Sequence, residues 1–284
     1  MKVFSAAAGP RLFLDHTSVL DIGSCFVGKV DIAPGRAIPD DGDPRIDHSL
    51  EGFLFTCGPD HIRHPEPIEG RKDGSRYPLH GSFSSHPAQI LFWDCQDGDA
   101  ECRATVPVAL ADGGNALLER HWRIDGESGE VCLSDRLTNT GTKSFPPLHM
   151  YHMNIGAWLF DGEVRLSGKM LENRSLPWNF GEDPGGVFCV PAVQEGEDWA
   201  EIALGPIAAI GGLTLKVKFR TDTLPWLQIW RNQQAPAHVL GIEPVSHRWV
   251  GRHELAERGE LQPLRPGESI DYGLRFCFAL ARLD

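Results

Sequence analysis

The stretch that decides the fold class is Leu213-Thr214-Leu215-Lys216-Val217-Lys218-Phe219-Arg220, in which apolar and polar side chains alternate. Successive side chains of a strand point to opposite faces, so this pattern places every apolar side chain on one face. A strand with one buried and one solvated face is typical of antiparallel sheets. Similar alternation recurs at residues 270–278, 131–137 and 118–124. These segments predict an all-β fold built from antiparallel sheets.

Turn residues support the same fold class. The pair Asp-Gly, which tolerates the positive φ angles of tight hairpins, begins at residues 41, 73, 97, 112, 125 and 161. Helix signals are weak, the best being residues 253–258, and no long amphipathic segments alternate with the strands as they do around a parallel sheet. Neither a repeat nor a low-complexity linker divides the chain, so we expect one domain over residues 1–284.

The overall charge argues against two classes of partner. The chain carries 27 Lys and Arg against 39 Asp and Glu, which gives a formal net charge of -12. A field of this sign repels nucleic-acid phosphates and anionic lipid, so we expect neither nucleic acid nor membrane as a partner. It suits a neutral small ligand, although a local basic pocket would still hold an anion.

Apolar stretches and cysteines bear on the cellular compartment. The most apolar stretch, residues 204–215, is interrupted by Gly and Pro and falls short of the roughly 20 residues that a membrane-spanning helix needs. The N-terminus shows no long apolar leader segment. Seven scattered cysteines, never spaced Cys-x-x-Cys, indicate neither a disulfide framework nor a thiolate zinc site. We therefore expect a cytoplasmic protein with reduced cysteines.

Familiar cofactor motifs are missing, and histidine is the reactive residue that remains. The sequence has no GxGxxG, GxxxxGK, GxSxG or HExxH pattern, so we do not expect nucleotide-dependent chemistry. Among twelve histidines, the one in YHMNIG at residues 151–156 is the most informative. On a strand, His152 and Asn154 share a face, whereas His149 points to the other side. The simpler interpretation of such a histidine is a hydrogen-bonded core residue.

Three other histidines allow a different interpretation. His61 and His64 lie in a loop that contains proline, where both imidazoles would reach one ion, but no carboxylate spacing makes a metal site specific. His80 precedes Gly81, which permits a tight turn that leaves the ring facing a cleft. A metal-dependent isomerase that uses His61, His64 and His80 therefore stays open, beside the view that His80 is an ordinary turn residue.

A face suited to a polyhydroxylated ligand occurs near the C-terminal third of the chain. On a strand, Trp226, Gln228 and Trp230 share one face, so two flat apolar surfaces flank an amide that both donates and accepts hydrogen bonds. Simple packing of the two tryptophans is the competing interpretation. Glu243 stands between apolar neighbours. It is either a buried carboxylate, which needs a partner, or an exposed charge at the end of a strand.

Taken together, five segments resemble the aldose 1-epimerase, or galactose mutarotase, superfamily, and more closely a branch known only as a domain of unknown function. They occur between residues 50 and 278 in the order of the family: FLFTCG at 53–58, LHG at 79–81, YHMNIG at 151–156, LPWLQIW at 224–230 and LGIEP at 240–244. The ordered set, rather than any one motif, carries the resemblance.

The resemblance implies a large antiparallel β supersandwich that binds a monosaccharide or sugar derivative and acts as an isomerase, interconverting its anomers. It implies that His152 is the general acid, that Glu243 is the general base, and that His80 contacts the ring oxygen or a neighbouring hydroxyl. Such chemistry needs one acid and one base and requires neither a metal nor another cofactor. The candidate substrate contacts are Asn154, Gln228, Trp230 and His61.

Some positions depart from the superfamily pattern. The motif with the general acid usually reads Asn-His-x-Tyr-Phe-Asn, where this chain has Tyr151-His152-Met153-Asn154, and an Asn-Arg pair that contacts sugar in many members has no clear match. Ser82 follows the His-Gly turn, where the branch tends to have Arg. These departures leave the sugar open. A sugar-binding module without catalysis and an epimerase or isomerase of an oxidised, deoxy or sulfonated sugar remain as alternatives.

Overall fold

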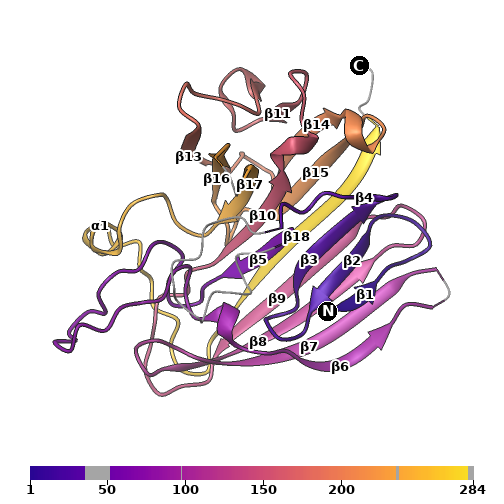
Figure 1. The fold of residues 1–284 in the computed structure, drawn as a ribbon. Coiled ribbons are helices and arrows are strands. Elements are labelled where there is room, and N and C mark those ends of the chain that lie inside the picture. Colours follow the sequence, from indigo (N-terminus) through magenta and orange to yellow (C-terminus); the bar gives the residue numbers. More distant parts are fainter. Residues whose placement is uncertain (36–51, 97, 235–236, 281–284) are drawn as a thin grey trace.

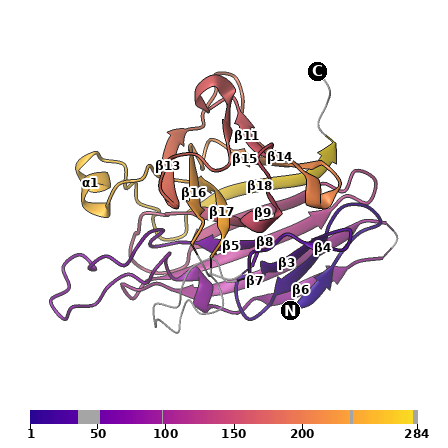
Figure 2. The same cartoon turned by 45° about the horizontal axis from the view of Figure 1, so that its top comes forward.

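Two antiparallel sheets make up the protein, as described by a computed structural model of residues 1–35, 52–96, 98–234 and 237–280. Each sheet has nine strands within these residues. The strands of the two sheets are layered on one another (Figure 1), and the view turned by 45° shows β5, β16 and β17 lying over the longer strands β8, β9 and β18 (Figure 2). The prediction of an all-β fold with antiparallel sheets is confirmed.

The first sheet combines strands from distant parts of the chain, between residues 2 and 245. Its order is β1-β2-β3-β5-β10-β17-β16-β13, with β4 paired to β3. The strands are β1 (Lys2–Phe4), β2 (Arg11–Asp15), β3 (Asp21–Val27), β4 (Val30–Asp31), β5 (Leu54–Cys57), β10 (Met150–Gly156), β13 (Gly185–Pro191), β16 (Trp226–Asn232) and β17 (Val239–Val245). Strands distant in the sequence, β5, β10 and β17, therefore become neighbours at its centre.

The second sheet contains the longer strands. Its order is β12-β11-β14-β15-β18-β9-β8-β7-β6. The strands are β6 (Gln89–Asp94), β7 (Ala100–Ala109), β8 (Asn115–Ile124), β9 (Val131–Asn139), β11 (Arg165–Gly168), β12 (Ser175–Pro177), β14 (Trp199–Ile207), β15 (Leu213–Arg220) and β18 (Ser269–Leu280). All four segments whose alternation predicted strands lie in this sheet, in β15, β18, β9 and β8.

Strand β15 shows how the alternating pattern builds the core. Its side chains Leu215, Val217 and Phe219 are fully buried between the sheets, whereas Lys216 and Lys218 lie on the outer face. Burying a side chain of this size stabilises the fold by about 1.5–3 kcal/mol relative to exposure. One contiguous cluster of buried apolar side chains extends through both sheets. The expectation of a single domain over residues 1–284 stays a prediction.

A buried polar cluster ties the two sheets together beneath the centre of the first sheet. Arg120 on β8 donates to both carboxylate oxygens of Asp135 at 2.9 and 2.6 Å, to Asp21 at 3.1 Å and to Thr56 at 2.8 Å. Tyr151 on β10 donates to Asp135 at 2.9 Å. Breaking a buried pair of this kind by removing one partner typically costs about 3–5 kcal/mol. The cluster therefore fixes β5 and β10 against the second sheet.

The turn signals are confirmed in part, because Gly74 and Gly113 have the positive φ expected after Asp whereas Gly126 and Gly162 do not. Asp125 joins β8 to β9 and accepts from the backbone N–H of Ser128 at 2.6 Å, and Asp112 lies in the connection from β7 to β8. The Asp-Gly pairs at 41 and 97 include positions outside the described residues. The helix signal corresponds to α1 (Arg252–Glu257), and the remaining helical turns are η1 (Phe83–Ser85), η2 (Ala157–Leu159), η3 (Glu172–Arg174) and η4 (Ala208–Ile210).

None of the helices in the described part of the chain has the length and apolar character needed to cross a bilayer.

All seven residues of β10 are buried. Since its two faces alternate, one face lies against the core, and the other lies under side chains from neighbouring strands and loops. Polar residues on that second face, His152 and Asn154, are thus withdrawn from bulk solvent.

Candidate active site

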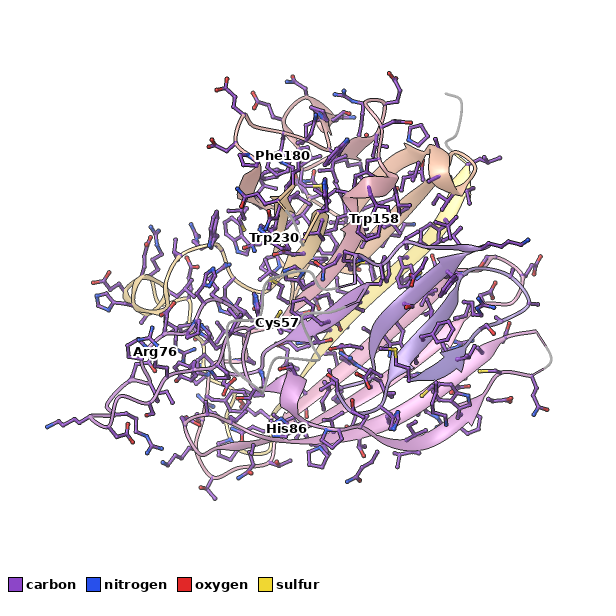
Figure 3. The ribbon with its side chains drawn as sticks, viewed as in Figure 1. Cys57, Arg76, His86, Trp158, Phe180 and Trp230 are labelled. Carbon is purple, nitrogen blue, oxygen red and sulfur yellow. The ribbon has the colours of Figure 1, made fainter. Side chains whose placement is uncertain are left out.

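A small cavity of about 190 Å³ opens on the first sheet, on the side away from the second sheet. Five of the predicted site residues line it, together with a residue that the sequence analysis did not single out, Arg63. The five predicted residues are His80, His152, Gln228, Trp230 and Glu243. Figure 3 marks one of them, Trp230 on β16, above Cys57 on β5. The floor of the cavity is thus built by the central strands of the sheet.

Strand register explains why these side chains converge. Met153 pairs with Ile242 across β10 and β17, which sets His152 opposite Glu243. Gln228 pairs with Glu243 across β16 and β17. The three polar side chains His152, Glu243 and Gln228 therefore form one row across three adjacent strands, on the face that carries the cavity.

His152 and Glu243 are in direct contact. The His152 Nε2 atom lies 3.2 Å from Glu243 Oε1, and both side chains are almost completely buried. Phe55 stacks on the His152 ring with 4.4 Å between ring centroids, and Trp230 meets its edge at 5.6 Å. The imidazole is held between two aromatic side chains, so its orientation toward Glu243 is fixed by packing.

Burial favours the uncharged forms of both groups. It raises the pKa of Glu243 to about 8, and the hydrogen bond from Gln228 and the charge of Arg63 only partly oppose this effect. Burial also holds the pKa of His152 well below its usual range, and a neighbouring imidazole, His80, acts in the same direction. At neutral pH the pair then consists of a carboxylic acid and a neutral imidazole, with the carboxyl proton available for transfer between them.

Gln228 links Glu243 to a partly buried cation, Arg63. Arg63 Nη1 donates to Gln228 Oε1 at 2.7 Å, and Gln228 Nε2 donates to Glu243 Oε2. These two bonds define the orientation of the amide, because its oxygen faces a donor and its nitrogen faces an acceptor. Arg63 Nη2 also donates to the backbone oxygens of His247 at 3.1 Å and of Arg248 at 2.7 Å. Gln228 therefore separates the guanidinium from the carboxyl group.

His80 reaches the cavity from a tight turn. Its own φ is 60° and that of Gly81 is 87°, both in the left-handed region. A Cβ atom at Gly81 would clash with the backbone oxygen of His61, so only glycine fits there. His80 Nδ1 pairs with the backbone oxygen of Ile62 at 3.1 Å, and burial lowers the pKa of the ring to about 3. The ring is thus neutral and faces His152 edge to face at 5.6 Å.

Two predicted contacts do not line the cavity. His61 is 1% exposed, stacks on Tyr77 and pairs through Nε2 with the backbone oxygen of His64 at 2.7 Å. Its ring holds the loop together rather than facing the cavity. Asn154 is fully buried beside His152 on β10 and contacts that ring, so it is one layer removed from a ligand.

The metal alternative gains no support from the geometry. No group of three His, Cys, Asp or Glu side chains within the described ranges is arranged to hold a metal ion. His61 and His80 each direct a ring nitrogen to a backbone oxygen, and His64 lies at the cavity without them. The seven cysteines are free thiols in the structure.

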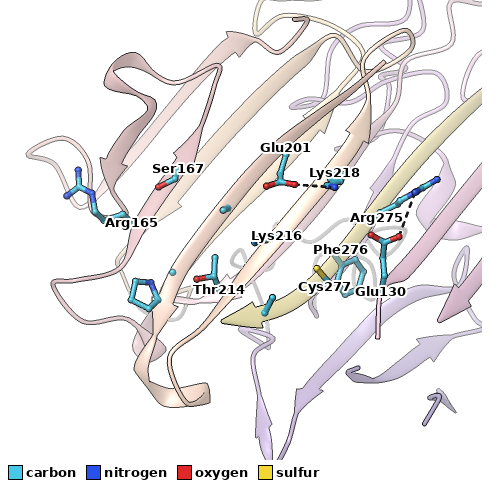
Figure 4. Close-up of a pocket in the computed structure, with 14 residues that line it drawn as sticks. Glu130, Arg165, Ser167, Glu201, Thr214, Lys216, Lys218, Arg275, Phe276 and Cys277 are labelled. Carbon is cyan, nitrogen blue, oxygen red and sulfur yellow. Dashed lines mark ion pairs between the residues drawn. The ribbon is translucent and has the colours of Figure 1, made fainter. Parts of the chain in front are cut away.

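A larger hollow lies elsewhere and has a different character. It measures about 790 Å³ and spans the outer face of the second sheet, on β11, β14, β15 and β18 (Figure 4). Two ion pairs cross its strands, with 3.4 Å between Lys218 Nζ and Glu201 Oε2 and 3.7 Å between Arg275 Nη1 and Glu130 Oε1. Exposed ion pairs of this kind are common on a solvated sheet face and do not by themselves indicate a binding site. The small cavity, with its buried acid/base pair, is the better candidate site.

Comparisons with known proteins concern the family and the fold of the chain. A family model described as a domain of unknown function, DUF4432, matches residues 21–176 and 182–277. No curated protein matches the chain.

Solved structures show what the fold resembles. A protein of Klebsiella pneumoniae, assigned but not shown to be an aldose 1-epimerase, has 19% identity and a TM-score of 0.74 over 96% of this chain and 77% of its own. A Synechocystis protein has 15% identity and a TM-score of 0.70, over 99% and 96%. A galactose mutarotase-like protein of Clostridium acetobutylicum has 11% identity and a TM-score of 0.67, over 98% and 95%. At these identities, the likeness establishes the fold.

Proposed function

Because the chain belongs to the DUF4432 family and has the fold of galactose mutarotase-like proteins, we propose that it is an isomerase that interconverts the anomers of a monosaccharide or sugar derivative by acid/base catalysis. The observation that carries the proposal is the contact of 3.2 Å between His152 Nε2 and Glu243 Oε1 at the floor of the cavity. We infer the substrate class, a sugar, from the names of the structural neighbours, and the reaction type, acid/base catalysis, from the geometry of the site.

Anomer interconversion requires two proton transfers at neighbouring atoms. The hydroxyl on the anomeric carbon loses its proton, the ring oxygen gains one, and the bond between that carbon and the ring oxygen breaks to leave an open-chain aldehyde. The aldehyde rotates and the ring closes on its other face. Both oxygens are bonded to the same carbon, so an acid and a base that lie 3.2 Å apart reach both at once. Each positioned group is typically worth about 10² to 10⁴ in rate.

The position of the proton decides which of Glu243 and His152 acts as acid and which as base in each half of the anomerisation. In the resting site the proton is on Glu243, because burial raises the pKa of this carboxyl to about 8 and keeps His152 neutral. Ring opening then proceeds with Glu243 donating to the ring oxygen and His152 accepting from the anomeric hydroxyl. Ring closure reverses both transfers, with His152 as acid and Glu243 as base. The resemblance implies the opposite assignment for ring opening, with His152 as the acid and Glu243 as the base, and we propose the reversed roles because burial favours the protonated carboxyl group and the neutral imidazole.

The size and lining of the cavity suit one sugar ring. Pockets for drug-sized ligands measure about 300–1,000 Å³, so about 190 Å³ admits one small ring rather than an oligosaccharide. Trp230 supplies a flat apolar surface of the kind that packs against the C–H face of a pyranose. Trp249, which is 47% exposed, stands at the same cavity and would cover a bound ring.

A sugar acid is a second candidate substrate, and Arg63 is the observation that favours it. Within the described residues this guanidinium donates only to neutral acceptors, and no carboxylate lies within 4.0 Å of it. A carboxylate or sulfonate on the sugar would give the cation a charged partner. A neutral aldose would use Arg63 only through neutral hydrogen bonds.

The test is a screen that reports binding and turnover together. Neutral aldoses and the corresponding sugar acids are mixed with the purified chain, and saturation-transfer and exchange NMR record ligand contact and the rate of anomer exchange. We expect exchange of at least one sugar to accelerate in proportion to protein concentration. Binding without acceleration would contradict the isomerase and favour a sugar-binding module. Absence of both would contradict the sugar itself.

A further inference from the structure

Two buried polar atoms next to each other lack hydrogen-bond partners among the described residues. They are Nδ1 of His152 and Oδ1 of Asn154. The two residues lie two apart on β10, so their side chains share the face that carries the cavity. A buried polar atom without a partner typically costs about 1–3 kcal/mol. A ring N–H and an amide oxygen are complementary, so a hydrogen bond between these two atoms would satisfy both.

The remaining contacts of Asn154 orient its amide for this role. Its Nδ2 donates to the backbone oxygen of Gly52 at 3.5 Å, and this assigns the nitrogen end of the amide. The oxygen end is then the one available to the ring of His152, with which the Asn154 side chain is in polar contact. Asn154 pairs with Gly241 on the neighbouring strand β17, which has no side chain to intervene.

We propose that Asn154 is a positioning residue, whose Oδ1 accepts a hydrogen bond from His152 Nδ1–H and thereby keeps the neutral imidazole in the tautomer that directs its Nε2 lone pair at Glu243. The kinetic consequence rests on the proposed function, whereas the tautomer itself does not. Asn154 thus acts through His152 and does not touch the ligand, in contrast to the hydroxyl contact expected for it.

The contacts of Glu243, the partner of His152, support the same tautomer. Gln228 Nε2 donates to Glu243 Oε2, so this oxygen is used as an acceptor. The proton of the carboxylic acid then belongs on Oε1, the atom that lies 3.2 Å from His152 Nε2. The other tautomer of His152 would direct a second proton into the same gap. With Asn154 bound to the far side of His152 and Gln228 bound to the far side of Glu243, a single proton lies between Oε1 and Nε2.

Nitrogen NMR of the imidazole tests the tautomer directly. The chain is labelled with ¹⁵N-histidine, and the His152 ring is assigned by its absence from the spectrum of His152→Asn. Two-bond and three-bond couplings between ring protons and nitrogens identify which nitrogen carries the proton. We expect Nδ1–H in the wild-type chain at neutral pH. A His152 ring protonated on Nε2 would overturn the proposal, whatever the variants do.

Variants of Asn154 test the consequence for catalysis. Asn154→Ala removes the acceptor, and we expect a mixture of tautomers and a kcat lowered roughly 10- to 100-fold, as for other groups that orient a functional imidazole. KM should stay within twofold, because Asn154 does not line the cavity. Asn154→Asp keeps an acceptor at the same position, so the Nδ1–H tautomer and most of kcat should return.

The outcomes separate this inference from the proposed function. A carboxylate at position 154 also favours the charged imidazole, so the pH profile of Asn154→Asp should gain an acidic limb that the wild-type chain lacks. If Asn154→Ala changes KM instead of kcat, or leaves the tautomer unchanged, the positioning role is contradicted. A chain with the expected tautomer that accelerates no sugar would reject the isomerase and leave the tautomer assignment standing.

Discussion

Arg63 Nη1 donates a hydrogen bond to Oε1 of Gln228 over 2.7 Å, although 165 residues separate the two in the chain. This bond fixes the amide so that its nitrogen faces Glu243. The guanidinium stays one side chain away from the carboxyl group, and its charge lowers the pKa of Glu243 less than burial raises it. The carboxyl group thereby remains protonated near neutrality instead of forming an ion pair with Arg63.

His152→Asn should remove the second member of the pair. The shorter amide cannot exchange a proton near neutral pH, so we expect kcat to fall about 10² to 10⁴-fold. The fold should survive, since the substitution is smaller and polar. His253→Asn is the matched control, because His253 has 89% of its side chain exposed on α1. Polarimetry on the preferred sugar measures both, and a His152→Asn variant with wild-type turnover would show that the proton moves elsewhere.

The pH profile tests whether the active form of the pair is the protonated one. With Glu243 protonated at rest, kcat should fall as pH rises through about 8, because ionisation of this carboxyl removes the acid that opens the ring. The pKa of His152 lies well below its usual range, so no acidic limb is expected between pH 6 and 8. Rates of anomer exchange across pH 5.5–9.5 measure this. A kcat that rises through pH 8 would show that the ionised carboxylate is the active form and would contradict this assignment.

Arg63→Met should shift that profile and weaken the reaction. The variant removes the charge that lowers the pKa of Glu243, so the alkaline limb should move to higher pH. A hydrogen bond to a charged group is worth about 1.5–3 kcal/mol, which corresponds to roughly a 10- to 100-fold loss in kcat/KM. The loss should be larger for a sugar acid than for the matching neutral sugar. Arg265→Met, with 76% of its side chain exposed, is the control.

Gly241→Ala should close the cavity. A Cβ atom there would lie 2.6 Å from Glu243 Oε1, 3.3 Å from Trp230 and 3.4 Å from His152. The methyl group therefore displaces the carboxyl group, and we expect kcat/KM to fall at least about tenfold with a raised KM. Gly162→Ala, where a Cβ meets nothing within 4 Å, is the control. Titration of the sugar into both variants measures the effect, and unchanged affinity in Gly241→Ala would remove this cavity from consideration.

The sequence predicts the strands of the sheets better than it predicts the residues that pack over them. Alternation in Leu213–Arg220 follows from one buried face, which is a local property of a strand, and the strand forms as expected. The strand pattern correctly predicts that Asn154 shares a face with His152. The residues that cover this face come from distant parts of the chain, so the local pattern does not predict them. The contact with Gly52 and the pairing with Gly241 bury Asn154. A strand pattern gives the direction of a side chain and not its distance from solvent.

The loop residues show the same limit. His61, Arg63 and His64 are neighbours in one segment, yet Arg63 faces Gln228, His64 lies at the cavity and His61 stacks on Tyr77. Their directions depend on partners far along the chain. The one sequence signal that would have drawn attention to Arg63 is a cation in the segment that carries the candidate histidines, and charge alone does not distinguish it from exposed Arg76.

The most direct test of the central claim is the rate constant for anomer exchange of the preferred sugar, measured by exchange NMR for the wild-type chain and for Glu243→Gln. The glutamine keeps the shape and the hydrogen bond from Gln228 but cannot give up a proton. We predict that binding is retained while the protein-dependent rate constant falls by about 10² to 10⁴. A Glu243→Gln chain that accelerates exchange as well as the wild-type chain would contradict it.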